Sequence, residues 1–252
     1  DHRPHAPARR VHLVADYYRP ATDTAPFPGA VVSEGLGGVK TARERRYGRF
    51  LAQHGCATLV IDSFRARGRA GAIHPVRAIA VTESMMLSDA FAGLAWLADR
   101  AEVDSSRIFN VGFSYGGMIA VLAAYEQLRR HFLGADGPRF AGHVSYYGPT
   151  VPRLEDPTTT GAPVVIFNGA RDDNLNRARL EAIVADLERG GSPVTSIVFP
   201  AARHQWDSND HVERFDRFNL RPGAVTIRRD GTIVDERGGR RVEGFWSRLG
   251  ML

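Results

Sequence analysis

The segment Gly112-Phe113-Ser114-Tyr115-Gly116-Gly117 places a serine between two glycines at the spacing of a nucleophile motif. An apolar run precedes it at residues 108–111, and a stretch of helical character follows at residues 118–130. A strand, a sharp turn and a helix in that order are the context of a nucleophile elbow. A side chain at position 112 or 116 would collide with backbone in so tight a turn. We therefore predict that Ser114 is a nucleophile, the alternative being a glycine-rich turn at a helix N-terminus.

A serine hydroxyl needs a base, and the base needs an acid that fixes its tautomer. Asp172 follows the apolar run at residues 163–167, and His204 follows a second such run at residues 194–199. Both residues are thus expected at the carboxyl edge of a sheet. Taken singly, Asp172 could form a turn and His204 could lie on the surface. The chain order serine, aspartate, histidine is that of α/β-hydrolases and favours a triad.

With these residues the chain resembles the dienelactone hydrolase family of α/β-hydrolases over most of residues 11–218. The segments that carry the resemblance are Tyr17-Tyr18-Arg19-Pro20, residues 29–38, residues 57–63, the elbow, residues 169–172 and His204. Founding members of that family have cysteine in the elbow, whereas this chain has Ser114 and so is similar to the esterase-like relatives.

Glu34 is the more specific part of the resemblance, because dienelactone hydrolases have a glutamate there that engages the nucleophile. An ionised carboxylate facing the developing oxyanion would slow acyl transfer. Glu34 must therefore be neutral, turned away or held by a partner. Our hypothesis is that it hydrogen-bonds the Ser114 hydroxyl or a nearby arginine at rest and swings aside for substrate. The alternative is a loop glutamate in solvent.

Two backbone amides are expected to form the oxyanion hole, those of Tyr115 and Gly35. Preorganised donors of this kind stabilise a transition state by roughly 3 to 4 kcal/mol each. The glycine run at residues 35–38 permits close backbone approach, and the resemblance supports the assignment.

Four further residues are candidates for substrate binding. Arg65 and Arg203 follow predicted strands and could pair with a substrate carboxylate. Tyr147 ends a predicted strand and Trp206 lies two residues past His204, so both are candidate pocket walls, with packing as the alternative.

Composition fits one enzyme domain. The chain has 252 residues, 43% of them hydrophobic and 24% charged, and no apolar run approaches ~20 residues, so no membrane span is expected. Its single cysteine excludes an internal disulfide and a cysteine-based metal site, and we expect no metal and no cofactor. The chain begins at Asp1, so we expect a soluble protein, either cytoplasmic or exported after removal of a leader.

The basic charge does not favour nucleic acid as a partner. The net charge is +5, but Lys40 is the only lysine, and the arginines are dispersed rather than gathered in one stripe with aromatics. The expected partner is a small-molecule ester or lactone, bound by a monomer or homodimer, with no nucleic acid and no membrane.

Apolar runs alternate with amphipathic stretches, which predicts an α/β-hydrolase fold with a mostly parallel twisted sheet and helices on both faces. The expected strands are residues 11–18, 29–33, 57–62, 107–111, 141–147, 163–168 and 194–199. The expected helices are residues 41–54, 82–100, 116–130, 176–189 and about 207–220. No insertion is long enough for a large cap. We expect one domain over residues 1–252, with an N-terminal arm at 1–10 and a C-terminal extension at 221–252.

That extension contains Asp230-Gly231 between two short apolar runs, which predicts a hairpin within residues 224–234. A short final helix is expected beyond it. Packing against the core is favoured over an arm that meets another subunit.

The resulting expectation is a serine hydrolase that cleaves a carboxylic ester or a lactone through an acyl-enzyme. The alternatives are an acyltransferase or peptidase with the same triad, and a ligand-binding homologue without turnover.

Overall fold

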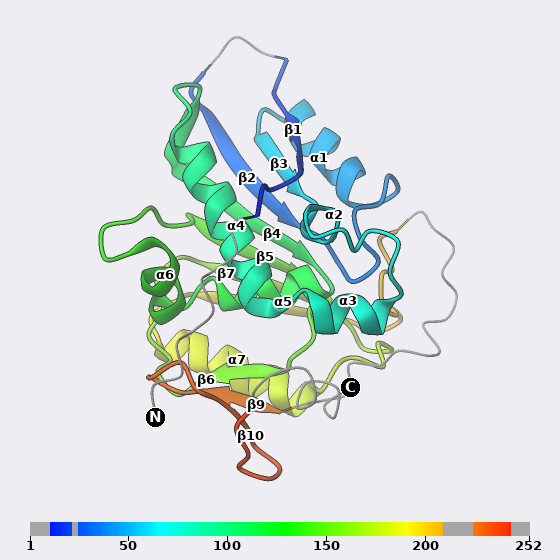
Figure 1. Ribbon diagram of the computed structural model, residues 1–252, viewed down its shortest axis with the longest axis vertical. Helices are drawn as coiled ribbons and strands as arrows, with labels where there is room; N and C mark the ends of the chain where they lie inside the picture. The colour runs from blue at the N-terminus through cyan, green and yellow to red at the C-terminus, as the bar shows by residue number, and fades with distance from the viewer. Residues whose placement is uncertain (1–10, 22–24, 209–223, 243–252) are drawn as a thin grey trace.

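The computed structural model describes residues 11–21, 25–208 and 224–242. Within them the main sheet contains β1 (Ala15–Tyr18), β2 (Phe27–Ser33), β3 (Ala57–Ile61), β4 (Val103–Phe113), β5 (Gly142–Tyr146), β7 (Val164–Gly169) and β8 (Val194–Phe199). The helices are α1 (Glu44–Gln53), α2 (Ser63–Ala66), α3 (His74–Ala80), α4 (Glu83–Ala98), α5 (Tyr115–Leu122), α6 (Glu126–Leu133) and α7 (Arg177–Arg189). Figure 1 shows how these elements are arranged.

The main sheet has the strand order β1-β3-β2-β4-β5-β7-β8. Only β1 is antiparallel to its neighbour, and the other strands pair in parallel. Because β2, β3, β4, β5, β7 and β8 are parallel, their carboxyl ends lie at one edge of the sheet, and helices connect them except between β5 and β7. This mostly parallel α/β fold confirms the predicted fold class.

Side-chain alternation along the strands assigns helices to both faces. Val31 on β2 belongs to the large apolar cluster that includes residues of α4, α5 and α7. The next residue, Val32, points to the opposite face and joins a smaller cluster with Tyr47 and Leu51 of α1. Successive residues of a buried parallel strand thus serve two cores, which explains why these strands are apolar without alternation.

Three helices begin at side-chain caps. Thr82 accepts a hydrogen bond from the amide of Met85 at the start of α4, and Asn176 accepts one from the amide of Arg179 at the start of α7. Asp62 caps α2 in the same way. Such caps satisfy amides that have no partner within the helix, and α4 and α7 begin close to the predicted positions, whereas α2 and α3 were not predicted.

The single helix predicted over residues 116–130 is wrong, because α5 and α6 are separate. Between them Tyr125 forms a bridge with Thr159, the carbonyl of Ala124 accepts from the amide of Thr160, and the amide of Glu126 donates to Thr158. Pairing with the 158–160 segment therefore replaces helical hydrogen bonds at this point. β1 is also shorter than predicted, and β4 is longer.

The predicted C-terminal hairpin is confirmed as β9 (Val225–Ile227) and β10 (Ile233–Asp235), which pair antiparallel around Gly231. β9 also pairs in parallel with β6 (Pro152–Leu154), so the hairpin packs on its own chain as favoured. The small sheet lies beside α7 at one end of the molecule (Figure 1). The helix predicted near residues 207–220 and the short final helix fall almost wholly outside the described residues, and Asp207 and Ser208 are not helical.

Among the residues described, no single helix is long and apolar enough to cross a membrane. α3 and α4 pass that test only as a pair, by length and composition, with a 73° bend between them.

Arg179 of α7 fastens the hairpin to the main body. Its guanidinium donates to both carboxylate oxygens of Glu236, at 2.8 and 2.9 Å, and to the carbonyls of Val151 and Val225. We expect Arg179→Met to lower the free energy of unfolding by about 2 to 3 kcal/mol, because hydrogen bonds to charged groups are lost. Hydrogen exchange should increase first at residues 224–236. Unchanged exchange there would contradict this assignment.

His143 of β5 is 1% exposed, and burial lowers the pKa of its imidazole to about 3. The unfolded chain therefore binds a proton below about pH 6.5 that the folded chain does not, so stability falls as the pH drops from there toward 3. This one group should contribute about 1.4 kcal/mol per pH unit in that window. The free energy of unfolding, measured with urea at several pH values between 4 and 6, should depend less steeply on pH for His143→Leu than for the wild type. An equal pH dependence in the two proteins would refute this.

Candidate functional site

The turn between β4 and α5 has the geometry of a nucleophile elbow. A Cβ on Gly112 would stand 1.9 Å from the carbonyl oxygen of Gly116, and one on Gly116 would stand 2.3 Å from that of Ser33. Ser114 has φ of 53° and ψ of −116°, a conformation that non-glycine residues rarely adopt. Its amide donates to the carbonyl of Tyr146 on β5 at 2.9 Å. The turn thus holds a strained serine at the carboxyl edge of the sheet.

The three predicted triad residues are in contact in series. Ser114 Oγ lies 2.9 Å from His204 Nε2, and His204 Nδ1 lies 2.7 Å from Asp172 Oδ2. The side chains come from the loops after β4, β7 and β8, and each residue is less than a tenth exposed. This arrangement allows the imidazole to accept the serine proton while the carboxylate holds the other ring nitrogen.

Backbone hydrogen bonds fix the loops that carry the acid and the base relative to each other. The amide of Ala170 donates to the carbonyl of Phe199 at 2.9 Å, and that of Arg171 donates to Ala202 at 3.0 Å. Asp172 Oδ1 accepts from the amide of Asn174, which leaves Oδ2 directed at the histidine. Because β7 and β8 are adjacent and parallel, their carboxyl ends bring the two loops together.

Aromatic residues support His204. The ring of Tyr147 lies edge-on to the imidazole with centroids 4.9 Å apart, and the ring of Trp206 packs on Tyr147 at 5.0 Å. The Tyr147 hydroxyl donates to Asp207 Oδ1 at 2.7 Å. Burial raises the pKa of the Tyr147 phenol well above its usual value, so the donor proton is retained.

Tyr147 was a candidate for substrate binding, with packing as the alternative, and its wholly buried side chain supports the packing alternative. In this position the ring packs against His204. Trp206 is partly exposed beside it, so its predicted place in a pocket wall remains a prediction.

Glu34 has a partner different from the two that the sequence hypothesis named. Its Oε1 accepts a hydrogen bond from the amide of Phe64 at 3.0 Å, and Oε2 has no hydrogen-bond partner among the described residues. The side chain is 1% exposed, which also excludes a solvated loop glutamate. Burial, followed by repulsion from Asp62, raises the pKa of Glu34 well above its usual value. Burial therefore favours the neutral form of this carboxyl group.

The two predicted oxyanion donors stand in different surroundings. Tyr115 begins α5, where amides point out of the helix end, and its side chain is buried. The amide of Gly35 instead donates to Glu44 Oε1, over a long 3.3 Å. A substrate oxygen would have to share this amide with a carboxylate, and both roles in oxyanion binding remain predictions.

Sequence reasoning missed Arg43 and Glu44, which form an ion pair with fully buried side chains next to Gly35. Adjacent residues of opposite charge before a helix resemble an ordinary solvated helix start, so the sequence contains no signal for their burial. The two arginines that were predicted as substrate ligands, Arg65 and Arg203, have exposed side chains.

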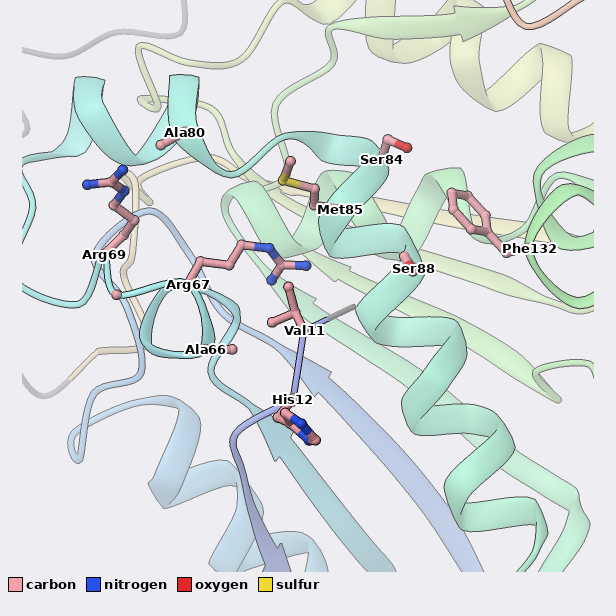
Figure 2. Close-up of a pocket in the computed structure, with 11 residues that line it drawn as sticks. Val11, His12, Ala66, Arg67, Arg69, Ala80, Ser84, Met85, Ser88 and Phe132 are labelled. Carbon is pink, nitrogen blue, oxygen red and sulfur yellow. The ribbon is translucent and has the colours of Figure 1, made fainter. Parts of the chain in front are cut away.

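A separate cavity of about 840 Å³ lies between the α2 region and α4, and its lining contains none of the three triad residues. Figure 2 shows the Arg67 side chain extending into this space near Ser88 and Met85. Its guanidinium makes a bidentate pair with Asp89, at 2.6 and 2.8 Å. The charge of Arg67 is therefore paired with a carboxylate of α4 and is not directed at a ligand. In the part of the chain that is described, no group of three or more metal-ligating side chains could hold a metal ion.

Solved structures with the same fold come from several enzymes. A candidate dienelactone hydrolase from Klebsiella pneumoniae subsp. pneumoniae is 23% identical, with a TM-score of 0.64 and coverage of 77% of this chain and 82% of that one. A dienelactone hydrolase-like promiscuous phosphotriesterase from metagenomic libraries is 20% identical, with a TM-score of 0.58 and coverage of 77% and 78%. An esterase from Thermogutta terrifontis with bound propionate is 18% identical, with a TM-score of 0.60 and coverage of 84% and 90%.

At these identities the structural likeness shows the fold. The sequence itself matches the dienelactone hydrolase family over residues 15–215, a span that contains the elbow, Asp172 and His204. From this match over most of its length, the chain belongs to the dienelactone hydrolase family of α/β-hydrolases.

Proposed function

We propose that this protein is a serine hydrolase that cleaves a carboxylic ester or a lactone through an acyl-enzyme. The observation that carries the proposal is the pair of contacts that joins Ser114 Oγ, the His204 imidazole and Asp172 Oδ2 in series. Family membership supports the same chemistry.

In this mechanism Ser114 Oγ attacks the substrate carbonyl carbon while His204 Nε2 accepts the serine proton. The carbonyl electron pair moves to oxygen, and the amides of Tyr115 and Gly35 bind the resulting oxyanion. Collapse breaks the bond to the alcohol oxygen, which takes the proton from His204. Water then repeats the sequence, its proton passing to His204 and on to Ser114, and the carboxylic acid is released. Asp172 orients the imidazole throughout.

Short acyl groups are the first substrates to test. The Thermogutta terrifontis esterase that shares the fold has been solved with propionate and with butyrate bound. The same protein has been obtained phosphorylated by paraoxon, which supports the use of organophosphorus probes for this chain.

The proposed nucleophile can be tested by covalent labelling. A fluorophosphonate probe should label the wild type at one site per chain and leave Ser114→Ala unlabelled. Hydrolysis of p-nitrophenyl acetate, propionate, butyrate and octanoate and of a lactone panel should fall at least about 1,000-fold in that variant, because the nucleophile is lost. Ser84→Ala is the matched control, since Ser84 is exposed and lines a cavity whose lining contains no triad residue.

Labelling of Ser114→Ala at the wild-type level would contradict the proposal. Absence of any labelling or turnover in the wild type would favour the ligand-binding alternative. Product release that requires an added alcohol or amine acceptor would favour an acyltransferase.

We further propose that Glu34 acts as a neutral acid held by the Phe64 amide. At neutral pH Glu34→Gln should keep kcat within about threefold, because glutamine reproduces an uncharged group that accepts this hydrogen bond. As the pH rises, the wild type should lose kcat when Glu34 ionises beside the oxyanion site, whereas the variant should not. pH profiles of kcat for both proteins test this. Identical alkaline limbs, or a large loss at neutral pH in the variant, would show that Glu34 does not act in this way.

A further inference from the structure

Arg43 is a fully buried cation next to the predicted oxyanion hole. Its Nε donates to Glu44 Oε1 at 2.8 Å, and its Nη2 lies 2.6 Å from the same oxygen. The guanidinium carbon lies 5.7 Å from the centroid of the Phe113 ring. Neither Nη1 nor Nη2 makes a well-aligned hydrogen bond within the described residues. Burial by itself would lower the pKa of the Arg43 guanidinium, but the adjacent Glu44 carboxylate outweighs it and raises that pKa.

The distances from one reference point, an ideal Cβ on Gly35, show where this guanidinium lies. A Cβ built on Gly35 would stand 3.0 Å from Arg43 Nη2, 3.2 Å from the carbonyl oxygen of Phe113 and 3.2 Å from Ser114 Cβ. The cation therefore lies against the backbone of Gly35, on the side of the nucleophile elbow. The positive charge of a buried arginine at that place attracts the negative charge that develops on the substrate oxygen during attack by Ser114.

Glu44 links the arginine to the segment of residues 34–40, which we call the oxyanion loop. Its Oε1 accepts from the amide of Gly35 at 3.3 Å, and its Oε2 accepts from the amide of Lys40 at 2.9 Å. One carboxylate thus holds the loop at two points. Its negative charge, however, lies beside the amide that is expected to bind the substrate oxyanion.

The function proposed above requires a positive potential at that place. A carboxylate without a counter-charge would oppose formation of the oxyanion, and a buried carboxylate whose partner is removed is strongly destabilising. The guanidinium meets both requirements, because it cancels the charge of Glu44 and fixes the direction of its oxygens.

Resting on the proposed function, we propose that Arg43 is a positioning residue of the oxyanion loop. Its buried guanidinium holds the Glu44 carboxylate on the amides of Gly35 and Lys40 and offsets the charge of that carboxylate where the oxyanion forms. Arg43 acts through Glu44 and the loop and does not contact the substrate itself.

The test compares the wild type with Arg43→Met, in which the Glu44 carboxylate loses its counter-charge, and uses the double variant Arg43→Met/Glu44→Gln as the rescue. We expect kcat of Arg43→Met to be about 100-fold lower, as for loss of electrostatic stabilisation at an oxyanion, and the double variant to recover much of this loss because no carboxylate charge remains to be offset. KM should change little. Affinity for an alkyl boronic acid, which forms a tetrahedral anion on the serine, should fall in parallel with kcat. Arg43→Lys, which retains the charge without the planar fork, should lie between the wild type and Arg43→Met.

All rates are expressed per active site titrated with the fluorophosphonate probe, so that a misfolded fraction does not enter kcat. Arg45→Met is the matched control, since Arg45 lies on the same helix and pairs with Asp16 at the partly exposed edge of the molecule. It should keep the wild-type kcat and boronic acid affinity. If Arg43→Met does not fold, Arg43→Lys takes its place in the comparison.

Equal kcat and equal boronic acid affinity in the two compared proteins, with an active wild type, would overturn the role of Arg43 and leave the proposed hydrolase function intact. A wild type that is neither labelled nor active on any ester or lactone would overturn both.

Discussion

The whole site depends on the close approach of backbone to backbone at the end of β4. Gly112 and Gly116 lie so close to neighbouring carbonyls that no side chain fits at either position. This approach turns the chain from strand to helix within a few residues and places Ser114 at the sheet edge. The loops after β7 and β8 lie at the same edge because these strands run parallel to β4, so three segments that are distant in the sequence meet there.

Backbone strain is concentrated where the chemistry is proposed. Among the described residues, the non-glycine residues with positive φ are Ser114, Tyr147 and Gln205. The first is the predicted nucleophile, the second packs on His204, and the third directly follows that histidine. Each such residue costs about 1 to 3 kcal/mol, which persists only where the surrounding structure determines the conformation. Here the determining structure is the packed sheet beneath them.

Two buried glutamates in one region of the molecule are managed in different ways. Glu34 has no cationic partner among the described residues, and burial raises the pKa of its carboxyl group and so favours the neutral form. Glu44 lies 2.6 Å from the guanidinium of Arg43 and forms an ion pair. Burial thus favours the neutral form of one acid at the start of the oxyanion loop, and a guanidinium offsets the charge of the other acid beside that loop.

Much of the fold and the centre of the site were readable from sequence because they rest on local rules. Three features can be recognised in the sequence without knowing any contact: the elbow glycines, the apolar strands and the order of Ser114, Asp172 and His204. Other features depend on pairing between distant segments. The break between α5 and α6 arises from hydrogen bonds to the 158–160 segment, and no residue between 116 and 130 predicts it.

The same reason explains the errors at the site. Glu34 was given the wrong partner because the amide of Phe64 comes from a different crossover, and backbone donors leave no trace in a sequence. For Tyr147 the sequence left a pocket wall and packing both open, and its burial follows from packing against His204 and Trp206. That the ion pair of Arg43 and Glu44 is buried can likewise be seen only from the tertiary structure.

Helix α1 connects two parts of the site that are far apart in the chain. Glu44 in its first turn holds the amide of Gly35, and Arg46, two residues further along, donates to the carbonyl of Asp207, three residues past the histidine. A shift of α1 would therefore move an oxyanion donor and the general base at the same time. Directed evolution toward new substrates should accordingly find few tolerated changes on the site-facing side of α1, and more in the 64–80 and 148–161 connections.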